Sequence, residues 1–217
     1  LIPSKDGYSF LPTTKSIGLP TSVVEVNFTT SLVACTDIII NGGFETANGW
    51  ELPATLYTAA YSTAIPHQGV RSLRTGIITA ADNRYSYSSG RQSVTIPGDI
   101  ASANLIFFIY PQSTETVSKI PPDAQIGTTL EATTLSGDVQ YVLITDLAGT
   151  ILEQLIWQQS NSSTWQGYSF DVTKYAGRTI QVHFGTYNDG YYGITSMYVD
   201  DVELQLCPGT IPTPTPV

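Results

Sequence analysis

Between Cys35 and Cys207 the sequence consists of short runs rich in β-branched and aromatic residues, separated by Gly, Pro, Asn or Asp. Such runs are typical of β-strands bounded by turns. No window sustains the 3.6-residue period of an amphipathic helix, so we expect almost no helix. The sequence therefore predicts an all-β fold, a two-sheet antiparallel β-sandwich. The predicted strands are TLYTAAYST, RYSYSSGRQSVTI, ANLIFFIY, VQYVLITD, TILEQLIW, GYSFDVT, TIQVHFGTY and SMYVDDVELQL.

Two connections between these runs are informative. The stretch DLAGT, residues 146–150, separates two predicted strands and has the residues of a hairpin turn. The stretch PQSTETVSKIPPDAQIGTTLEATT, residues 111–134, contains three prolines and fits no strand. We expect a long surface loop there, and ordered loops of this length tend to be functional or to make contacts.

The residues before Cys35 differ from the rest. Prolines and glycines interrupt the first twenty residues, which favours an extended arm. In the following SVVEVNFTTSLVA, Val24, Val26 and Phe28 alternate with polar residues, the two-residue period of a half-buried strand. Residues 1–34 are therefore interpreted as an arm with an additional strand.

Two further segments complete the predicted organisation. Residues 35–207 form the predicted sandwich. Residues 208–217, PGTIPTPTPV, are a Thr-Pro repeat that favours polyproline II and is expected to be a tail or linker.

Cysteine content and chain start favour an exported protein. The two cysteines, Cys35 and Cys207, flank the predicted sandwich, which favours one disulfide formed in an oxidising compartment. Two buried free thiols are the alternative. A first residue Leu1 in place of Met suits a mature product whose signal peptide was removed. We expect a secreted, extracellular or cell-surface protein.

Charge and hydropathy exclude two classes of partner. The chain has 18 acidic and 9 Lys or Arg residues, a formal net charge of -9 that repels nucleic acid and anionic lipid. No apolar run approaches the roughly 20 residues of a transmembrane helix, so no membrane span is expected.

Motifs of common enzyme classes are missing from the sequence. The chain has two histidines, His67 and His183, and neither belongs to an H-E-x-x-H pattern; no G-x-S-x-G stretch is present. His183 lies within QVHFG, where alternation makes it a residue on one face of a strand. The protein is therefore predicted to be non-catalytic.

Four motifs occur in a characteristic order. They are NGGFETANGW (41–50), HQGVRSLRTG (67–76), DVTKYAGRTIQVHFGTYND (171–189) and MYVDDVELQL (197–206). The chain from about residue 37 to 206 resembles the galactose-binding-like jelly rolls, in particular the carbohydrate-binding modules grouped around families 4, 9 and 22. The resemblance implies a jelly-roll sandwich, but it specifies the ligand poorly because the fold hosts several functions.

The same resemblance implies a structural calcium ion where the first and last strands meet. Its ligands would be the Glu45 carboxylate, a carboxylate of Asp200 or Asp201, and main-chain carbonyls near His67 and Val70. Calcium prefers such oxygen ligands, and the nearby glycines let the backbone approach. Solvated carboxylates at strand ends are the alternative.

Exposed aromatic rings stack on sugar faces, which makes several residues candidates for glycan contact. These candidates are Tyr85, Tyr87, Trp157, Tyr187, Tyr191 and Tyr192. Asn27 and Asn161 match the N-glycosylation acceptor pattern.

Two functions remain open. The first is a subunit of an extracellular filament or surface assembly, a homopolymer in which Val24, Val26 and Phe28 form a donor strand on a neighbouring copy. The second is a carbohydrate-binding module of a larger secreted, glycan-active protein, with the Thr-Pro tail as its linker. We favour the assembly, because a module of the second kind would leave the arm without a role.

Overall fold

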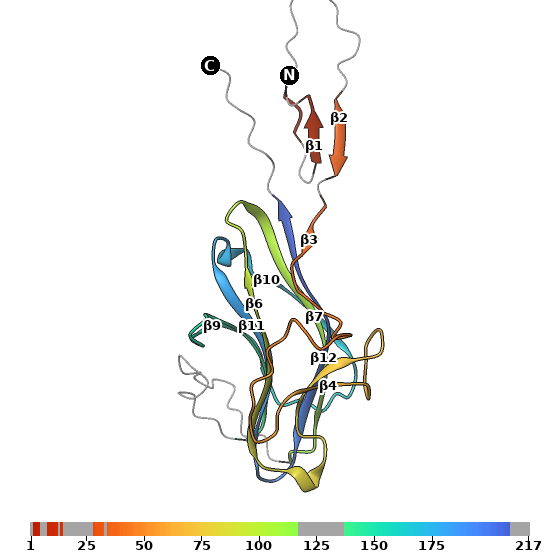
Figure 1. The fold of residues 1–217 in the computed structure, drawn as a ribbon, viewed down its shortest axis with the longest axis vertical. Helices are drawn as coiled ribbons and strands as arrows, with labels where there is room; N and C mark the ends of the chain where they lie inside the picture. Colours follow the sequence, from red (N-terminus) through yellow and green to blue (C-terminus); the bar gives the residue numbers. More distant parts are fainter. Residues whose placement is uncertain are drawn as a thin grey trace, which may run out of the picture.

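The computed structural model describes residues 2–4, 8–12, 14, 28–32, 34–116 and 137–208. In these residues the regular structure consists of β-strands and two single-turn 3-10 helices, with no α-helix, which confirms the predicted all-β class (Figure 1). The elements are β1 Tyr8–Leu11, β2 Thr29–Leu32, β3 Thr36–Asp37, β4 Ala60–Ser62, β5 Ser72–Gly76, η1 Ala80–Asp82, β6 Tyr85–Thr95, β7 Ile100–Ser113, β8 Val139–Thr145, β9 Ile151–Gln158, β10 Gln166–Asp171, η2 Thr173–Tyr175, β11 Thr179–Asp189 and β12 Thr195–Pro208. None of the described helices is long and apolar enough to cross a membrane.

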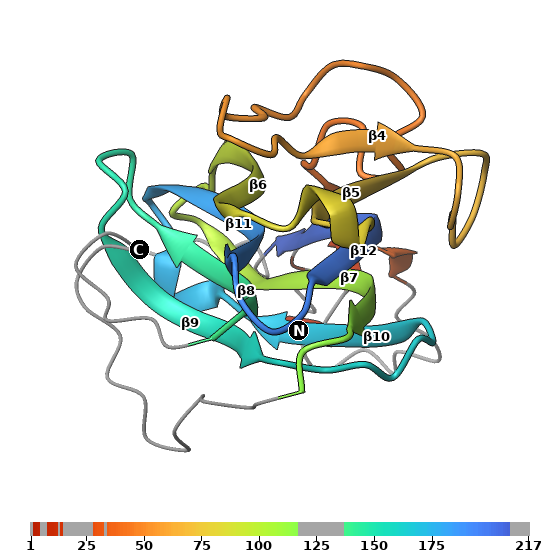
Figure 2. The same cartoon turned by 90° about the horizontal axis from the view of Figure 1, so that it is seen from below.

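Two antiparallel sheets pack face to face. One sheet has the order β10-β7-β12-β5-β4, and β3 pairs with the end of β12. The other has the order β6-β11-β8-β9. Seen along the long axis of the molecule, the two sheets lie on opposite sides (Figure 2). The predicted two-sheet sandwich is therefore confirmed.

The core lies between the sheets because alternate residues of each strand point inward. Phe107 of the larger sheet and Phe184 of the smaller one meet with ring centroids 5.0 Å apart, and neither side chain is exposed. Burying each such ring contributes about 1.5–3 kcal/mol. Val142 and Val182 belong to the same buried cluster, so the even-numbered positions of β8 and β11 face inward.

The first and last strands of the sandwich lie side by side. Asp37 of β3 is opposite Gln205 of β12, and just outside this pair Cys35 and Cys207 form the predicted disulfide, with their Cα atoms 4.2 Å apart. The bond closes a sequence separation of 172 residues. The ends of the sandwich are thus joined covalently.

The prediction missed or misplaced some strands. The residues of β5 belong to the motif HQGVRSLRTG but to none of the predicted strands. Their sequence SLRTG has no aromatic residue and ends in glycine, so it does not indicate a strand. β5 is a strand because it pairs with β12 and all five residues are buried. In the run TLYTAAYST only residues 60–62 form a strand, β4. The predicted hairpin at Asp146 is present, with its N–H bonded to the Thr150 carbonyl at 2.9 Å.

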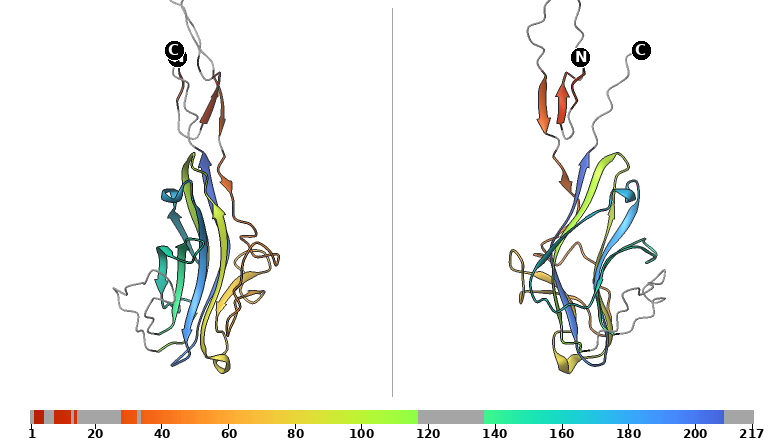
Figure 3. Two further views of the ribbon diagram at one scale, coloured as in Figure 1. Left: turned by 60° about the vertical axis from the view of Figure 1, so that its left-hand side comes forward. Right: turned by 180° about the vertical axis from the view of Figure 1, so that it is seen from behind.

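The N-terminal arm pairs with itself in its described part. β1 and β2 form an antiparallel pair in which Tyr8 is opposite Leu32 and Leu11 is opposite Thr29 (Figure 3). The strand begins one residue after Phe28, which was predicted to lie within it. The predicted donor-strand residues Val24 and Val26 lie outside the described residues, as do the tail after residue 208 and residues 117–134 of the predicted long loop.

Candidate functional site

The outer face of the four-stranded sheet carries a second apolar cluster. The odd-numbered residues of β8 and β11 point away from the core, because their even-numbered neighbours belong to it. This outer cluster contains Val139, Tyr141, Leu143 and Tyr187, packed against Tyr87, Ile151 and Trp157. Four of the seven members are aromatic, and they come from all four strands of the sheet.

Three tyrosines form one end of this cluster. The ring of Tyr85 meets those of Tyr87 and Tyr187 edge-on, at centroid distances of 5.8 and 5.6 Å. Tyr87 and Tyr187 are paired across β6 and β11, with centroids 4.9 Å apart. Tyr85 is 54% exposed, whereas Tyr187 is 6% exposed. Cross-strand packing covers the ring of Tyr187, which supports the other two rings; a glycan contact of Tyr187 itself stays a prediction.

Trp157 lies at the other side of the same face, on the edge strand β9. It is half-buried, and its ring centroid is 6.0 Å from that of Tyr141, its partner across β8 and β9. Tyr141 is fully buried and lies over Gly185, where a Cβ atom would come within 2.2 Å of the Tyr141 ring. Only glycine leaves room for this ring, so Gly185 sets how close Tyr141 lies to the sheet.

His183 lies on the same face of β11, as predicted, and is 7% exposed. Burial, with a smaller effect of the Arg91 charge, lowers the pKa of His183 to about 4. Arg91 lies opposite His183 on β6 and forms a two-bond ion pair with Glu51, at 2.7 and 3.0 Å. His183 is thus a neutral, buried residue at neutral pH.

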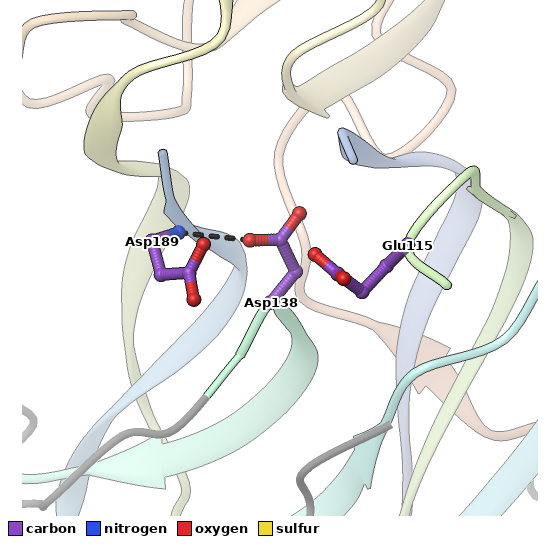
Figure 4. A group of neighbouring side chains, drawn as sticks. All are labelled: Glu115, Asp138 and Asp189. Atoms are coloured by element: carbon purple, nitrogen blue, oxygen red, sulfur yellow. Dashed lines mark hydrogen bonds between the residues drawn. The ribbon is translucent and has the colours of Figure 1, made fainter. Parts of the chain in front are cut away.

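Three carboxyl groups converge at the end of the sandwich where β7 and β11 end and β8 begins. The side chains of Glu115, Asp138 and Asp189 point toward one another, with Asp138 in the middle (Figure 4). One carboxylate oxygen from each lies within 4.8 Å of the others. Sequence reasoning missed this cluster, because the three residues are far apart in the chain and only strand pairing brings them together.

Asp138 is the buried member of this group. It is 0% exposed, and desolvation raises its pKa to about 6. Its Oδ1 accepts the main-chain N–H of Asp189 at 2.8 Å, and its Oδ2 accepts the Asn188 Nδ2 at 2.9 Å. These hydrogen bonds hold the carboxyl group in one orientation.

The loop after β11 carries two predicted aromatic candidates. Tyr191 and Tyr192 are 68% and 66% exposed, with ring centroids 6.4 Å apart. The N–H of Tyr191 donates to Oδ1 of Asp189 at 2.8 Å, so the loop is attached to the acidic cluster. Tyr85 is paired with Asp189, which puts it at the same end of the sheet.

The residues predicted to bind calcium are brought together at the opposite sheet, but in a different arrangement. Oε1 of Glu45 accepts the N–H groups of Val70 and Arg71 at 2.8 and 3.1 Å. Oδ2 of the fully buried Asp200 accepts the N–H of His67 at 2.8 Å. The loop thus turns these N–H groups toward the carboxylates, and calcium binding by main-chain carbonyls near His67 and Val70 stays a prediction.

Gly69 and the pair of Asp201 with His67 complete the contacts of this region. A Cβ atom on Gly69 would lie 2.1 Å from Oε1 of Glu45, so glycine is needed for the loop to come this close. Asp201 pairs with Nδ1 of His67, whose ring stacks on Phe108 at a centroid distance of 4.0 Å. Among the described residues, the group of three or more metal-ligating side chains within 4.8 Å is the acidic cluster. Because the predicted site at Glu45 combines carboxylates with main-chain carbonyls, calcium binding there stays a prediction.

Of the two predicted glycosylation acceptors, Asn27 lies outside the described residues and Asn161 is exposed. Oδ1 of Asn161 accepts the main-chain N–H of Ser113 at 3.2 Å. Glycosylation at Asn161 stays a prediction.

Comparison with known proteins identifies the fold. No protein-family model and no curated protein matches the chain. A solved family 61 carbohydrate-binding module, in complex with β-1,4-galactotriose, aligns with a TM-score of 0.50 at 13% identity, covering 78% of this chain and 97% of that one. The CBM22-1 xylan-binding domain of Xyn10C from Paenibacillus barcinonensis aligns with a TM-score of 0.47 at 14% identity, covering 83% and 100%. A family 16 carbohydrate-binding module gives 0.42 at 13% identity, covering 77% and 98%.

The likeness to the family 61 module shows the fold: the chain is a β-sandwich of the carbohydrate-binding-module kind, as its motifs predict. At this level of identity the likeness extends to the fold alone.

Proposed function

We propose that the protein is a non-catalytic, secreted carbohydrate-binding module that binds a glycan on the outer face of its four-stranded sheet. The observation that carries the proposal is the group of accessible aromatic rings on this face, Tyr85 and Tyr87 at one side and Trp157 at the other. Aromatic rings supply flat apolar surfaces that stack on sugar rings. The buried Tyr187 and Tyr141 lie behind them and keep their orientation, which lowers the entropy lost on binding.

The ligand we expect is a neutral glycan. The chain has a net charge of -9, and the acidic cluster lies at the end of the aromatic face, so an anionic polysaccharide would be repelled. Arg91 is 31% exposed on the same strand as Tyr85, but Glu51 neutralises it. One fold neighbour was solved in complex with β-1,4-galactotriose and another is a xylan-binding domain, which makes neutral β-linked chains the first probes to use.

The filament function has no support in the described residues. β2 pairs with β1 of its own chain, where the assembly hypothesis needs a free donor strand. The solved structure that shares the fold at a TM-score of 0.50 is a carbohydrate-binding module. We therefore expect a discrete particle, without polymerisation, in sedimentation velocity.

The test is glycan binding by isothermal titration calorimetry with β-1,4-galactan, xylan and other neutral oligosaccharides. Tyr87→Ala and Trp157→Ala should each weaken binding about tenfold, which corresponds to about 1.4 kcal/mol. Tyr110→Ala, a half-buried tyrosine on the other sheet, is the matched control and should leave affinity unchanged. The proposal is refuted if no glycan binds, or if both aromatic variants bind as the wild type does.

A further inference from the structure

The acidic cluster has the geometry of a cation site. Glu115, Asp138 and Asp189 each offer one oxygen, and all three lie within 4.8 Å of one another (Figure 4). Two ligands on opposite sides of a Ca²⁺ ion, at about 2.4 Å each, are about 4.8 Å apart, so three oxygens within this limit can contact one calcium ion together.

A fourth residue points to a ligand independently of these carboxylates. Asn188 is 0% exposed, and its side chain is directed at Asp138, to which Nδ2 donates at 2.9 Å. Its Oδ1 is buried and has no hydrogen-bond partner. Oδ1 and Nδ2 of one planar amide are about 2.3 Å apart, so this orphan oxygen lies within about 5 Å of the Asp138 carboxylate. A buried acceptor without a donor is costly, and a cation would satisfy it.

The charge balance agrees with this geometry. Among the described residues, neither Asp138 nor Asp189 forms an ion pair with an arginine or a lysine. The Asn188 amide and the Thr195 side chain donate to the buried carboxylate, and the carboxylates of Glu115 and Asp189 lie beside it; carboxylate oxygens are the ligands that hard divalent cations prefer.

We propose that Glu115, Asp138 and Asp189, with the amide oxygen of Asn188, bind one calcium ion at the end of the sandwich. This site is distinct from the Glu45 region, which lies on the other sheet. The ion would join the end of β7, the start of β8 and the end of β11. It would also hold the following loop, because Tyr191 is bonded to Asp189.

The experiment uses the whole chain after removal of metal with EDTA and gel filtration. Calcium is titrated by calorimetry, and Tb³⁺ is titrated by luminescence with tyrosine excitation, since Tyr191 lies two residues from a proposed ligand. The wild type should bind Ca²⁺, and Asp189→Asn and Glu115→Gln should each raise the Kd at least tenfold. Both residues are partly exposed, so these variants avoid the folding defect that a change at buried Asp138 could cause.

Two controls separate this site from others. Asp99→Asn removes the same charge at an exposed turn before β7 and should leave the Kd within twofold of the wild type. Glu45→Gln should also leave the Kd for calcium within twofold of the wild type. The proposal is overturned if the wild type binds no metal, if either Asp189→Asn or Glu115→Gln binds as tightly as the wild type, or if Glu45→Gln alone abolishes binding.

Discussion

His183 makes the stability of the sandwich depend on pH between about pH 7 and pH 4. Its ring is 7% exposed, meets Tyr141 edge-on at 5.5 Å, and lies beside Arg91. Burial is the main cause that lowers its pKa to about 4, from an ordinary value of about 6.5. The folded state therefore favours the neutral ring.

The sign follows from proton uptake. As the pH falls below about 6.5, the unfolded chain binds a proton at this histidine and the folded chain does not, so stability is lost until the pH reaches about 4. The pKa of His183 differs by about 2.5 between the two states, which corresponds to a full loss of about 3 kcal/mol in the free energy of unfolding. At pH 4.5 about 2.5 kcal/mol of it has been lost, and above pH 7 none.

The measurement is urea unfolding of the wild type and His183→Phe, followed by tryptophan fluorescence at pH 7.5 and at pH 4.5. Phenylalanine has a similar shape and does not titrate. Burial raises the pKa of Asp138 and of Asp200 to about 6, which changes stability in the opposite direction over this range. The informative quantity is therefore the difference between the two proteins, which cancels these carboxyl groups.

We expect His183→Phe to gain about 2.5 kcal/mol relative to the wild type between pH 7.5 and pH 4.5. If the difference between the two proteins is the same at both pH values, within about 0.5 kcal/mol, His183 is not held neutral and the reasoning is wrong.

Three further predictions concern the packing at Gly185, the hydrogen bonds of Glu45 and the disulfide. Gly185→Ala should lower the free energy of unfolding by about 1–3 kcal/mol in urea, because the new Cβ would come within 2.2 Å of the buried Tyr141 ring; Gly98→Ala, whose Cβ would have ordinary contacts, should change it little. Glu45→Gln should lower the melting temperature equally with calcium and with EDTA, since it weakens hydrogen bonds to main-chain N–H groups; a loss seen with calcium alone would support the predicted metal role. Reducing the disulfide, which spans 172 residues, should cost about 2–5 kcal/mol, and unchanged unfolding after verified reduction would contradict this.

Strand content could be predicted because it depends on local pattern. The run ANLIFFIY alternates buried and half-buried residues along β7 as its two-residue period indicates, and the turn at Asp146 follows from the Asp and Gly that such a hairpin requires. β5 could not be predicted in this way. Its sequence SLRTG has weak strand propensity, and its pairing with β12 outweighs that propensity.

Which aromatic residues are accessible depends on neighbours from distant parts of the chain. Tyr85 and Tyr187 look alike in sequence, yet one is 54% exposed and the other 6%. Strand register decides the difference, because Tyr187 is on a central strand between Tyr87 and Val139, whereas Tyr85 lies at the end of its strand.

The all-β class, the favoured pairing of the two cysteines and the resemblance to carbohydrate-binding modules can be predicted from the sequence, since they depend on composition, alternation and short motifs. That Glu45 and Asp200 face main-chain N–H groups is known from the folded arrangement alone. The folded arrangement also assembles the acidic cluster from residues 115, 138 and 189. The physical reason is that ligand geometry depends on which strand ends meet and which way a loop turns its peptide groups, and both are set by long-range pairing that leaves no local signal in the sequence.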